Sequence, residues 1–327
     1  MNRKIKIIGE AGLNHNGNYK TAMKLINIGK MAGVDYVKFQ LFDTDEFINR
    51  DYKHKKIKYN HIFKRFKSLE FSVNKWKKLI KYGNKKGVKI FFSVFNLRSL
   101  KTLQKLNIRI IKIPSGEINN IPLLKEINKK KFSVILSTGM SSLKEISLAI
   151  KTLNSCKVEL MHCVSEYPTK YPKLNTIKLL KKKFKKPVGY SDHTADTMTP
   201  ALSVVAGAES IEKHFTYNKK QKIGDHKFSL SPLELKDMVN KVKQSEKSLG
   251  IETDKRISSK EKKLQFFARK GLYANKNLKK NQRLSLNDIS ILRPEGRTKV
   301  SDLKKILNRK LKIDINKNQS LDFSLFR

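Results

Sequence analysis

Eight short apolar runs recur along the first two thirds of the chain, and each run ends in polar residues. Most of them are rich in β-branched residues and almost continuously apolar, which is typical of parallel strands that are buried on both faces. We therefore expect strands within residues 6–12, 36–40, 88–95, 108–117, 133–139, 158–167, 187–194 and 209–216.

Amphipathic segments separate these runs. In residues 21–33, 142–154 and 199–208, apolar positions recur at spacings of three and four, as on one face of a helix. Strands that alternate with helices indicate repeated βα units, and eight such units predict an α/β fold of the TIM (β/α)8 barrel type. The longest interruption, from Phe42 to about Lys86, predicts a partly helical insertion near the mouth of the barrel.

Three segments follow the eighth expected strand. Residues 231–250 form a helical pattern that opens on Ser-Pro, a helix-initiation signal. Residues 251–265 are charged and poor in core positions, which predicts a linker. Residues 266–327 contain short apolar runs and many turns, which predicts a small β-rich domain after a barrel domain at residues 1–250. Because so short a segment forms only a small core, we expect it to pack on a partner surface.

The net charge is extreme, with 72 Lys and Arg against 28 Asp and Glu, a balance of +44. Such a charge suits a protein that binds nucleic acid or an anionic membrane. It is also explained by a compositional bias toward Lys, Asn and Ile at solvated positions, and the basic residues are spread over the whole chain. Because no nucleic-acid motif or basic stripe interleaved with aromatics is present, we do not expect nucleic acid as the main partner.

The sequence favours a cytoplasmic protein without a membrane span. No apolar run approaches the roughly 18 residues of a membrane helix, and the opening MNRKIKIIGEAG has no apolar stretch of signal-peptide length. The two cysteines, Cys156 and Cys163, provide no disulfide framework.

Functional side chains of a TIM barrel gather at the carboxyl ends of its strands. Charged and polar residues are concentrated at these expected positions. They include Glu10, Lys38, Gln40, Ser93, Lys112, Ser115, Glu117, Ser137, Tyr167, Ser191, His193, Glu212, His214 and Asp225.

Two histidines are candidate metal ligands. His193 and His214 end strands that neighbour each other in the expected barrel, so their side chains can meet. Two neutral imidazoles with a carboxylate and waters suit Mn²⁺, Fe²⁺ or Zn²⁺. Alternatively, the two rings only hydrogen-bond a substrate or neighbouring loops.

Two lysines are candidate anion-binding groups. Lys38 and Lys112 lie in runs that should be buried, where lysine is uncommon without a partner. Together they would hold a carboxylate or phosphate. The alternatives are a Schiff base on one lysine, or structural ion pairs with Glu10 or Glu117.

Small and acidic residues complete the candidate site. Ser115 and Ser137, next to glycines that allow close backbone approach, would line an anion cradle. Glu10 and Glu117 are candidate acid–base groups, since nearby lysines and a metal would shift their pKa values.

Eight motifs resemble those of the sialic acid synthases, the enzymes that make nine-carbon nonulosonic acids. They occur in family order between Glu10 and Leu230 and read GEAGLNHNGN, VKFQ, IKIPSGEINNIPLL, LSTGMSS, HCVSEYPTKY, GYSDHT, IEKHFT and GDHKFSL. The segment ARKGLYANKNLKKNQRLSLNDISILRPEG is similar to the antifreeze-like SAF domain that ends those enzymes. The resemblance covers nearly the whole chain.

The resemblance implies a metal-dependent condensation of phosphoenolpyruvate with N-acetylmannosamine or a related acetamido- or diacetamido-hexose, with phosphate released by C–O cleavage. A legionaminic or pseudaminic acid synthase is the alternative within the family. The implied metal is Mn²⁺, with Mg²⁺ or Co²⁺ as alternatives, and the implied assembly is a domain-swapped homodimer.

The resemblance also implies a role for each matching position. His193 and His214 would bind the metal, and Glu10 and Glu117 would take catalytic positions. Phosphoenolpyruvate would be bound by Lys38, Lys112, Ser115, Ser137 and Ser191. The sugar would be bound by Gln40, Tyr167 and Asp225, and by Phe267 and Arg293 from the neighbouring subunit.

One departure from the family pattern bears on the sugar. The family often has a Thr-Pro pair after the third strand, whereas this chain has SVFN with Val94. We therefore expect an altered sugar pocket.

Overall fold

The computed structural model describes residues 4–54, 57–221, 224–250 and 255–327. The chain folds into two compact units, Met1–Ile251 and Glu252–Arg327. No helix of the described residues is long and apolar enough to cross a membrane.

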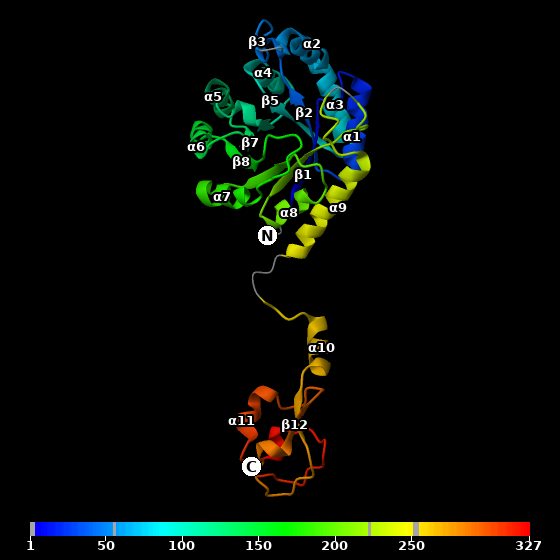
Figure 1. Ribbon diagram of the computed structural model, residues 1–327, viewed down its shortest axis with the longest axis vertical. Helices are drawn as coiled ribbons and strands as arrows, with labels where there is room; N and C mark the ends of the chain where they lie inside the picture. Colours follow the sequence, from blue (N-terminus) through cyan, green and yellow to red (C-terminus); the bar gives the residue numbers. More distant parts are fainter. Residues whose placement is uncertain (1–3, 55–56, 222–223, 251–254) are drawn as a thin grey trace. The chain divides into compact units, whose positions relative to one another are not determined.

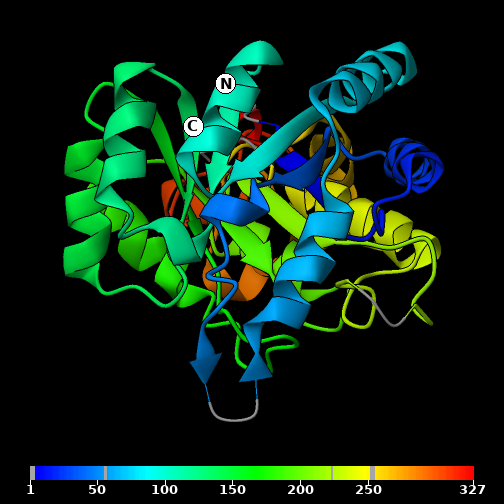
Figure 2. The same ribbon diagram turned by 90° about the horizontal axis from the view of Figure 1, so that it is seen from above.

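The first unit is a closed barrel of eight parallel strands in the order β1-β10-β9-β8-β7-β6-β5-β2, surrounded by helices (Figures 1 and 2). The predicted TIM barrel is therefore confirmed. Its strands are β1 (Lys6–Gly12), β2 (Tyr36–Leu41), β5 (Lys89–Val94), β6 (Ile110–Ile113), β7 (Ser133–Ser137), β8 (Lys157–His162), β9 (Val188–Asp192) and β10 (Ser210–His214). The helices are α1 (Tyr19–Ala32), α2 (Tyr59–Leu69), α3 (Val73–Lys86), α4 (Leu97–Lys105), α5 (Ile121–Lys129), α6 (Leu143–Thr152), α7 (Asn175–Phe184), α8 (Thr199–Val205) and α9 (Pro232–Leu249).

Alternation along the strands places polar side chains above an apolar floor inside the barrel. Ile8, Phe91, Ile135 and Met161 pack together as a buried apolar cluster. Residues two positions further along each strand share the same face. The side chains above this floor are therefore Glu10, Ser93, Ser137 and Cys163.

The insertion after β2 is partly helical, as predicted. It contains the antiparallel pair β3 (Lys53–His54) and β4 (Ile57–Lys58), followed by α2 and α3. Figure 2 shows this pair projecting away from the barrel wall. Phe42, Phe47 and Phe66 pack against one another where the insertion joins the barrel, with ring centroids 5.2 to 5.6 Å apart.

The second unit is small and contains the antiparallel pair β11 (Gly271–Ala274) and β12 (Ile289–Leu292), with a short helix, α11 (Leu303–Ile306). Its own core is apolar, and it includes Leu272, Leu284, Leu311 and Phe326.

The predicted linker at residues 251–265 is partly helical, because α10 occupies Ser259–Ala268. The helix begins with a capping box in which Ser258 Oγ accepts from the Glu261 amide and Glu261 accepts from the Ser258 amide. This Ser-x-x-Glu signal is visible in the sequence, so the prediction of a linker without a helix was wrong here. Residues 251–254 of the predicted linker lie outside the described residues.

Candidate active site

A cavity of about 290 Å³ opens at the carboxyl ends of the barrel strands. Most side chains that the sequence analysis selected line this mouth cavity. They are Glu10, Lys38, Gln40, Ser93, Lys112, Ser115, Ser137, Tyr167, Ser191, His193, Glu212 and His214. Residues from all eight barrel strands or strand ends thus meet there, which only closure of the barrel can achieve.

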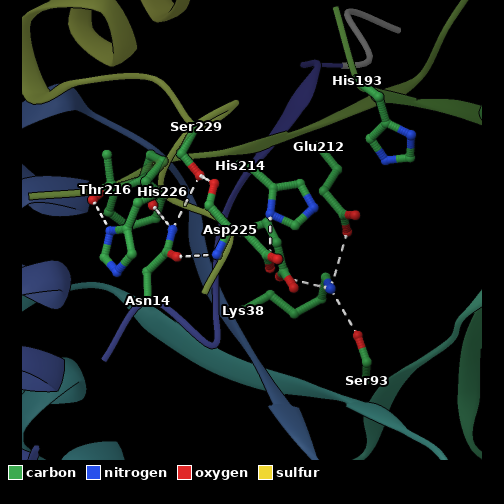
Figure 3. A network of polar contacts seen from close by, with 12 residues as sticks. Asn14, Lys38, Ser93, His193, Glu212, His214, Thr216, Asp225, His226 and Ser229 are labelled. Carbon is green, nitrogen blue, oxygen red and sulfur yellow. Dashed lines mark hydrogen bonds and ion pairs between the residues drawn. The ribbon is translucent and has the colours of Figure 1, made fainter. Parts of the chain in front are cut away.

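Buried ammonium and carboxyl groups alternate in the mouth cavity, above the apolar floor (Figure 3). Lys38 Nζ lies 2.6 Å from Glu10 Oε2 and 3.6 Å from Glu212 Oε2, and it donates to Ser93 Oγ at 2.7 Å. Lys112 Nζ lies 2.5 Å from Glu212 Oε1. The predicted alternative of an ion pair with Glu10 therefore describes Lys38.

Burial and the neighbouring lysines give the carboxyl groups of Glu10 and Glu212 very different pKa values. Burial raises the pKa of Glu10 to about 7, although Lys38 opposes the shift. Burial would also raise the pKa of Glu212, but Lys112 and Lys38 together lower it to about 2. One carboxyl group in this network therefore exchanges a proton near neutral pH, and the other stays ionised.

Glu212 joins the two lysines of this network, although the sequence pattern predicts no role for it beyond its place at a strand end. It bridges both lysines, and its Oε1 also accepts from Ser191 Oγ at 3.0 Å. The signal in the sequence was its spacing, since it lies two residues before His214 and so points to the same side of β10.

His193 and His214 face each other, with ring centroids 5.9 Å apart. His193 Nδ1 lies 2.6 Å from the Val164 carbonyl oxygen, which orients the ring and leaves Nε2 toward the cavity. His214 Nδ1 lies 3.5 Å from Asp225 Oδ2. Tyr167 packs on His193 at 4.1 Å between ring centroids.

The two imidazoles fit a divalent transition metal. Burial lowers the pKa of His193 to about 4, and burial together with His193 lowers the pKa of His214 well below its usual value. Both rings are therefore neutral at pH 7 and keep a lone pair for a cation. No group of three or more His, Cys, Asp or Glu in the described residues is arranged to hold a metal.

Hydroxyl and thiol groups line the side of the cavity next to Lys112. Ser115 Oγ accepts from the Gly139 amide at 3.1 Å, and Cys163 Sγ lies 3.3 Å from both Ser115 Oγ and Ser137 Oγ. A β-carbon at Gly139 would lie 2.7 Å from this sulfur. Ser115, Ser137 and Cys163 therefore form a compact group that only glycine allows at position 139, and their role as an anion cradle stays a prediction.

Two of the predicted sugar-binding side chains, Gln40 and Asp225, approach each other and Glu10 around Gly12, which has φ of +50°. A β-carbon there would lie 3.0 Å from Asp225 Oδ2, 3.2 Å from Glu10 Oε1 and 3.5 Å from Gln40 Nε2. Burial raises the pKa of Asp225 to about 6, with Arg65 of helix α2 opposing the shift.

Four of the predicted residues, all of them within the described chain, do not line the mouth cavity itself. Asp225 lies just beyond it, against His214. Glu117 is half-buried beside it and accepts from Asn120 Nδ2 at 2.8 Å, and burial raises its pKa. Phe267 and Arg293 belong to the second unit, where Phe267 is 68% exposed.

A TIM barrel with buried ammonium groups, carboxylates and paired imidazoles at its mouth defines an enzyme for an anionic substrate. The NeuB family model matches residues 25–254, and the SAF domain model matches residues 269–327. The chain belongs to the NeuB family and ends in a SAF domain.

Named relatives support this assignment. The chain is 41% identical to an uncharacterised protein of Methanocaldococcus jannaschii, over 94% of this chain and 90% of the relative. It is 38% identical to the N,N'-diacetyllegionaminic acid synthase of Campylobacter jejuni, over 89% and 91%. The crystal structure of an N-acetylneuraminic acid synthetase from Leptospira borgpetersenii, in complex with citrate, is 31% identical and matches with a TM-score of 0.74, over 81% of this chain and 92% of that one.

Proposed function

We propose that the protein condenses phosphoenolpyruvate with a 2-acetamido- or 2,4-diacetamido-hexose to give a nonulosonic acid and phosphate. One observation carries the proposal: two buried ammonium groups that a small anion can reach and a pair of neutral imidazoles share one cavity of the barrel. The similarity to an N,N'-diacetyllegionaminic acid synthase favours the diacetamido acceptor over N-acetylmannosamine.

Phosphoenolpyruvate would bind at the lysines. Lys38 and Lys112 would exchange part of their contact with Glu10 and Glu212 for the carboxylate and phosphate of the substrate. Ser115, Ser137 and Ser191 would donate their hydroxyl hydrogens to the same oxygens. A bound trianion would then meet donors that the barrel already holds in place.

The acceptor would present its aldehyde carbon to C3 of phosphoenolpyruvate. A C–C bond forms between them, water adds its oxygen to C2, and the resulting tetrahedral adduct loses phosphate by cleavage of the C2–O bond. Holding both substrates in one cavity would remove up to about 7–11 kcal/mol of the entropic barrier.

Enzymes of this family are generally metal-dependent. His193 and His214 would hold the ion, and Mn²⁺ is the proposed metal, with Mg²⁺ or Co²⁺ as alternatives. When bound, such an ion acts as a Lewis acid that polarises the acceptor aldehyde.

Two carboxyl groups are available for proton transfer. Glu10 would accept the proton of the attacking water, because its pKa of about 7 matches this task near neutral pH. Glu117 would act at the edge of the cavity, where burial raises its pKa.

The remaining side chains would select the sugar. Gln40, Tyr167 and Asp225 would contact its hydroxyl and acetamido groups. Phe267 and Arg293 would reach the sugar from the second subunit of a domain-swapped homodimer. The exposure of Leu264, Phe266 and Phe267 on α10, a helix without buried side chains, supports a partner surface for this segment.

The test is phosphate release from phosphoenolpyruvate with Mn²⁺ and a panel of acetamido- and diacetamido-hexoses, followed by mass spectrometry of the product. We expect a nine-carbon acid that contains the three phosphoenolpyruvate carbons. Absence of phosphate release with every sugar would reject the proposal.

A further inference from the structure

The loop between β10 and α9 is tied to the end of β1 by Asn14, a residue that the proposed reaction does not use. Asn14 is fully buried, and both polar atoms of its side chain are engaged. Its Oδ1 accepts from the Asp225 amide at 2.8 Å, and its Nδ2 donates to the Phe215 carbonyl at 2.8 Å and to Ser229 Oγ at 3.0 Å (Figure 3).

These bonds close a ring around Asp225. Ser229 Oγ donates to the Asp225 carbonyl at 2.5 Å, so the amide and the carbonyl of Asp225 are both held by side chains that also bond each other. More than 200 residues of chain separate Asn14 from this loop. The ring therefore fixes the loop to the barrel rather than to its own sequence neighbours.

The residue before Asp225 fits the same arrangement. Gly224 has φ of +94°, and a β-carbon there would lie 3.0 Å from Asn14 Oδ1. On the other side of the loop, His226 Nε2 lies 3.3 Å from Asn16 Oδ1. Two asparagines of the β1–α1 loop thus flank the backbone that presents Asp225.

The result is a defined place for the Asp225 carboxyl group. Its Oδ2 lies 3.5 Å from His214 Nδ1 and next to Gly12, where Glu10 and Gln40 also converge. A carboxyl group on a free loop would sample many positions, because each unfixed backbone residue has several accessible conformations.

We infer that Asn14 is a positioning residue for sugar recognition: through its ring with Ser229 it holds the Asp225 carboxyl group where the acceptor sugar binds. This inference rests on the proposed function. Asn14 touches no substrate in this assignment and acts only through Asp225.

The test compares steady-state kinetics of Asn14→Ala and Ser229→Ala with wild type at saturating Mn²⁺. Asn14→Ala should raise KM for the acceptor sugar about tenfold or more, while KM for phosphoenolpyruvate changes less than about twofold. Ser229→Ala should also raise KM for the acceptor sugar. In the double variant this KM should rise by less than the product of the two single fold-changes, because both residues belong to one ring. Ser229→Ala also keeps the inference testable if Asn14→Ala does not fold.

Asn18→Ala is the matched control. Asn18 lies on the same loop, but its side chain caps α1 by accepting from the Thr21 amide, so this variant should leave both KM values unchanged. An active wild type with an unchanged sugar KM in Asn14→Ala and Ser229→Ala would overturn the positioning role alone. A wild type that releases no phosphate with any sugar would overturn the proposed function and this inference with it.

Discussion

Asp192 and Lys213 form a buried ion pair directly behind the two imidazoles of the site. Lys213 Nζ lies 2.5 Å from Asp192 Oδ2 and 2.5 Å from the Thr194 carbonyl, and both charged residues are 1% exposed. Each is the chain neighbour of a histidine, His193 or His214. Because side chains alternate along extended backbone, the ion pair lies on the outer side of the wall and the histidines face inward.

This ion pair should support both stability and metal binding. Lys213→Met would leave the Asp192 carboxylate buried without a cation, which typically costs about 3–5 kcal/mol. It would also loosen the strand ends that carry the histidines, and loss of such support typically lowers metal affinity about 10–100-fold. Urea unfolding and Mn²⁺ titration by electron paramagnetic resonance measure the two effects.

Lys4→Met provides the control for removing a paired lysine. The ion pair of Lys4 with Asp35 is exposed, so its loss should cost less than about 1 kcal/mol and leave Mn²⁺ affinity unchanged. The double variant Asp192→Asn/Lys213→Met should regain part of the lost stability. Unchanged Mn²⁺ affinity in Lys213→Met would show that the pair does not support the histidines.

Metal binding and turnover should fail together when His214 is removed. His214→Ala deletes one of two neutral imidazoles at the cavity, so Mn²⁺ affinity and phosphate release should both fall by at least about tenfold. Chelation of the wild type should abolish turnover, and added Mn²⁺ should restore it.

His162→Ala is the matched histidine control. His162 is also buried on a barrel strand, but its Nε2 lies 2.9 Å from the Pro172 carbonyl rather than at the cavity. The His162→Ala variant should bind Mn²⁺ with the affinity of the wild type. Full Mn²⁺ occupancy in His214→Ala would reject the ligand assignment.

A methyl group at Gly139 should obstruct phosphoenolpyruvate more than the sugar. The added carbon would collide with Ser165 Oγ and lie 2.8 Å from Ser115 Oγ, and so displace donors of the anion cradle. We expect KM for phosphoenolpyruvate to rise about 10-fold or more in Gly139→Ala, since lost charge-assisted hydrogen bonds cost about 1.5–3 kcal/mol.

Gly116→Ala controls for adding a methyl group beside the same cavity, because a β-carbon there meets no protein atom within 4 Å. Its KM for phosphoenolpyruvate should stay within about twofold of wild type. Equal effects of the two variants would argue against a cradle centred on Gly139.

Local patterns were sufficient to predict the barrel and most of its mouth. Each strand is an apolar run, and its polar end follows directly in sequence, so the positions of His193, Lys38 and Ser137 could be inferred without coordinates. The capping box that starts α10 was equally local, and it was overlooked because the segment offers no core positions.

The pairing of Lys112 with Glu212 could not be predicted in this way. Lys112 and Glu212 are 100 residues apart and meet only because the barrel closes. The same holds for Asn14 and Asp225. Alternation predicts which side chains face the inside of the barrel, but which partner each of them contacts depends on strand register and side-chain length, and neither is encoded in a local pattern.

The pH dependence of catalysis should reveal Glu10. If Glu10 accepts the proton of the attacking water, it must be ionised, so kcat/KM for phosphoenolpyruvate should rise as the pH increases through about 7 and level off above it. Glu10→Gln should lower kcat/KM about 10²–10⁴-fold and remove this rise. The measurement is kcat/KM between pH 5.5 and 9, a range of about three and a half units around the pKa.

Glu117→Gln serves as the comparison in the same experiment. The substrate phosphate titrates near pH 6 with every variant, so only differences between profiles are informative. Glu117→Gln should keep the rise near pH 7. Loss of the rise in Glu117→Gln and its retention in Glu10→Gln would assign the base to Glu117 instead.

Mixed dimers of two inactive variants should regain activity if the second unit of each chain completes the active site of the other subunit. His214→Ala damages the barrel, and Arg293→Ala removes the proposed sugar contact of the SAF domain. In a mixed dimer with swapped domains, the barrel of the Arg293→Ala chain would receive an intact Arg293 from its partner. Protein from co-expression of the two variants should therefore release phosphate from phosphoenolpyruvate, whereas each variant alone should not.

A mixture of His193→Ala and His214→Ala distinguishes this recovery from nonspecific stabilisation. Both substitutions lie in the barrel, so no arrangement of domains creates an intact site and no activity should return. If Arg293 served its own chain, the pairing of His214→Ala with Arg293→Ala would stay equally inactive, because every barrel would still lack one of the two groups. Recovery in the first mixture alone is therefore the result that requires exchange of the SAF domain between subunits.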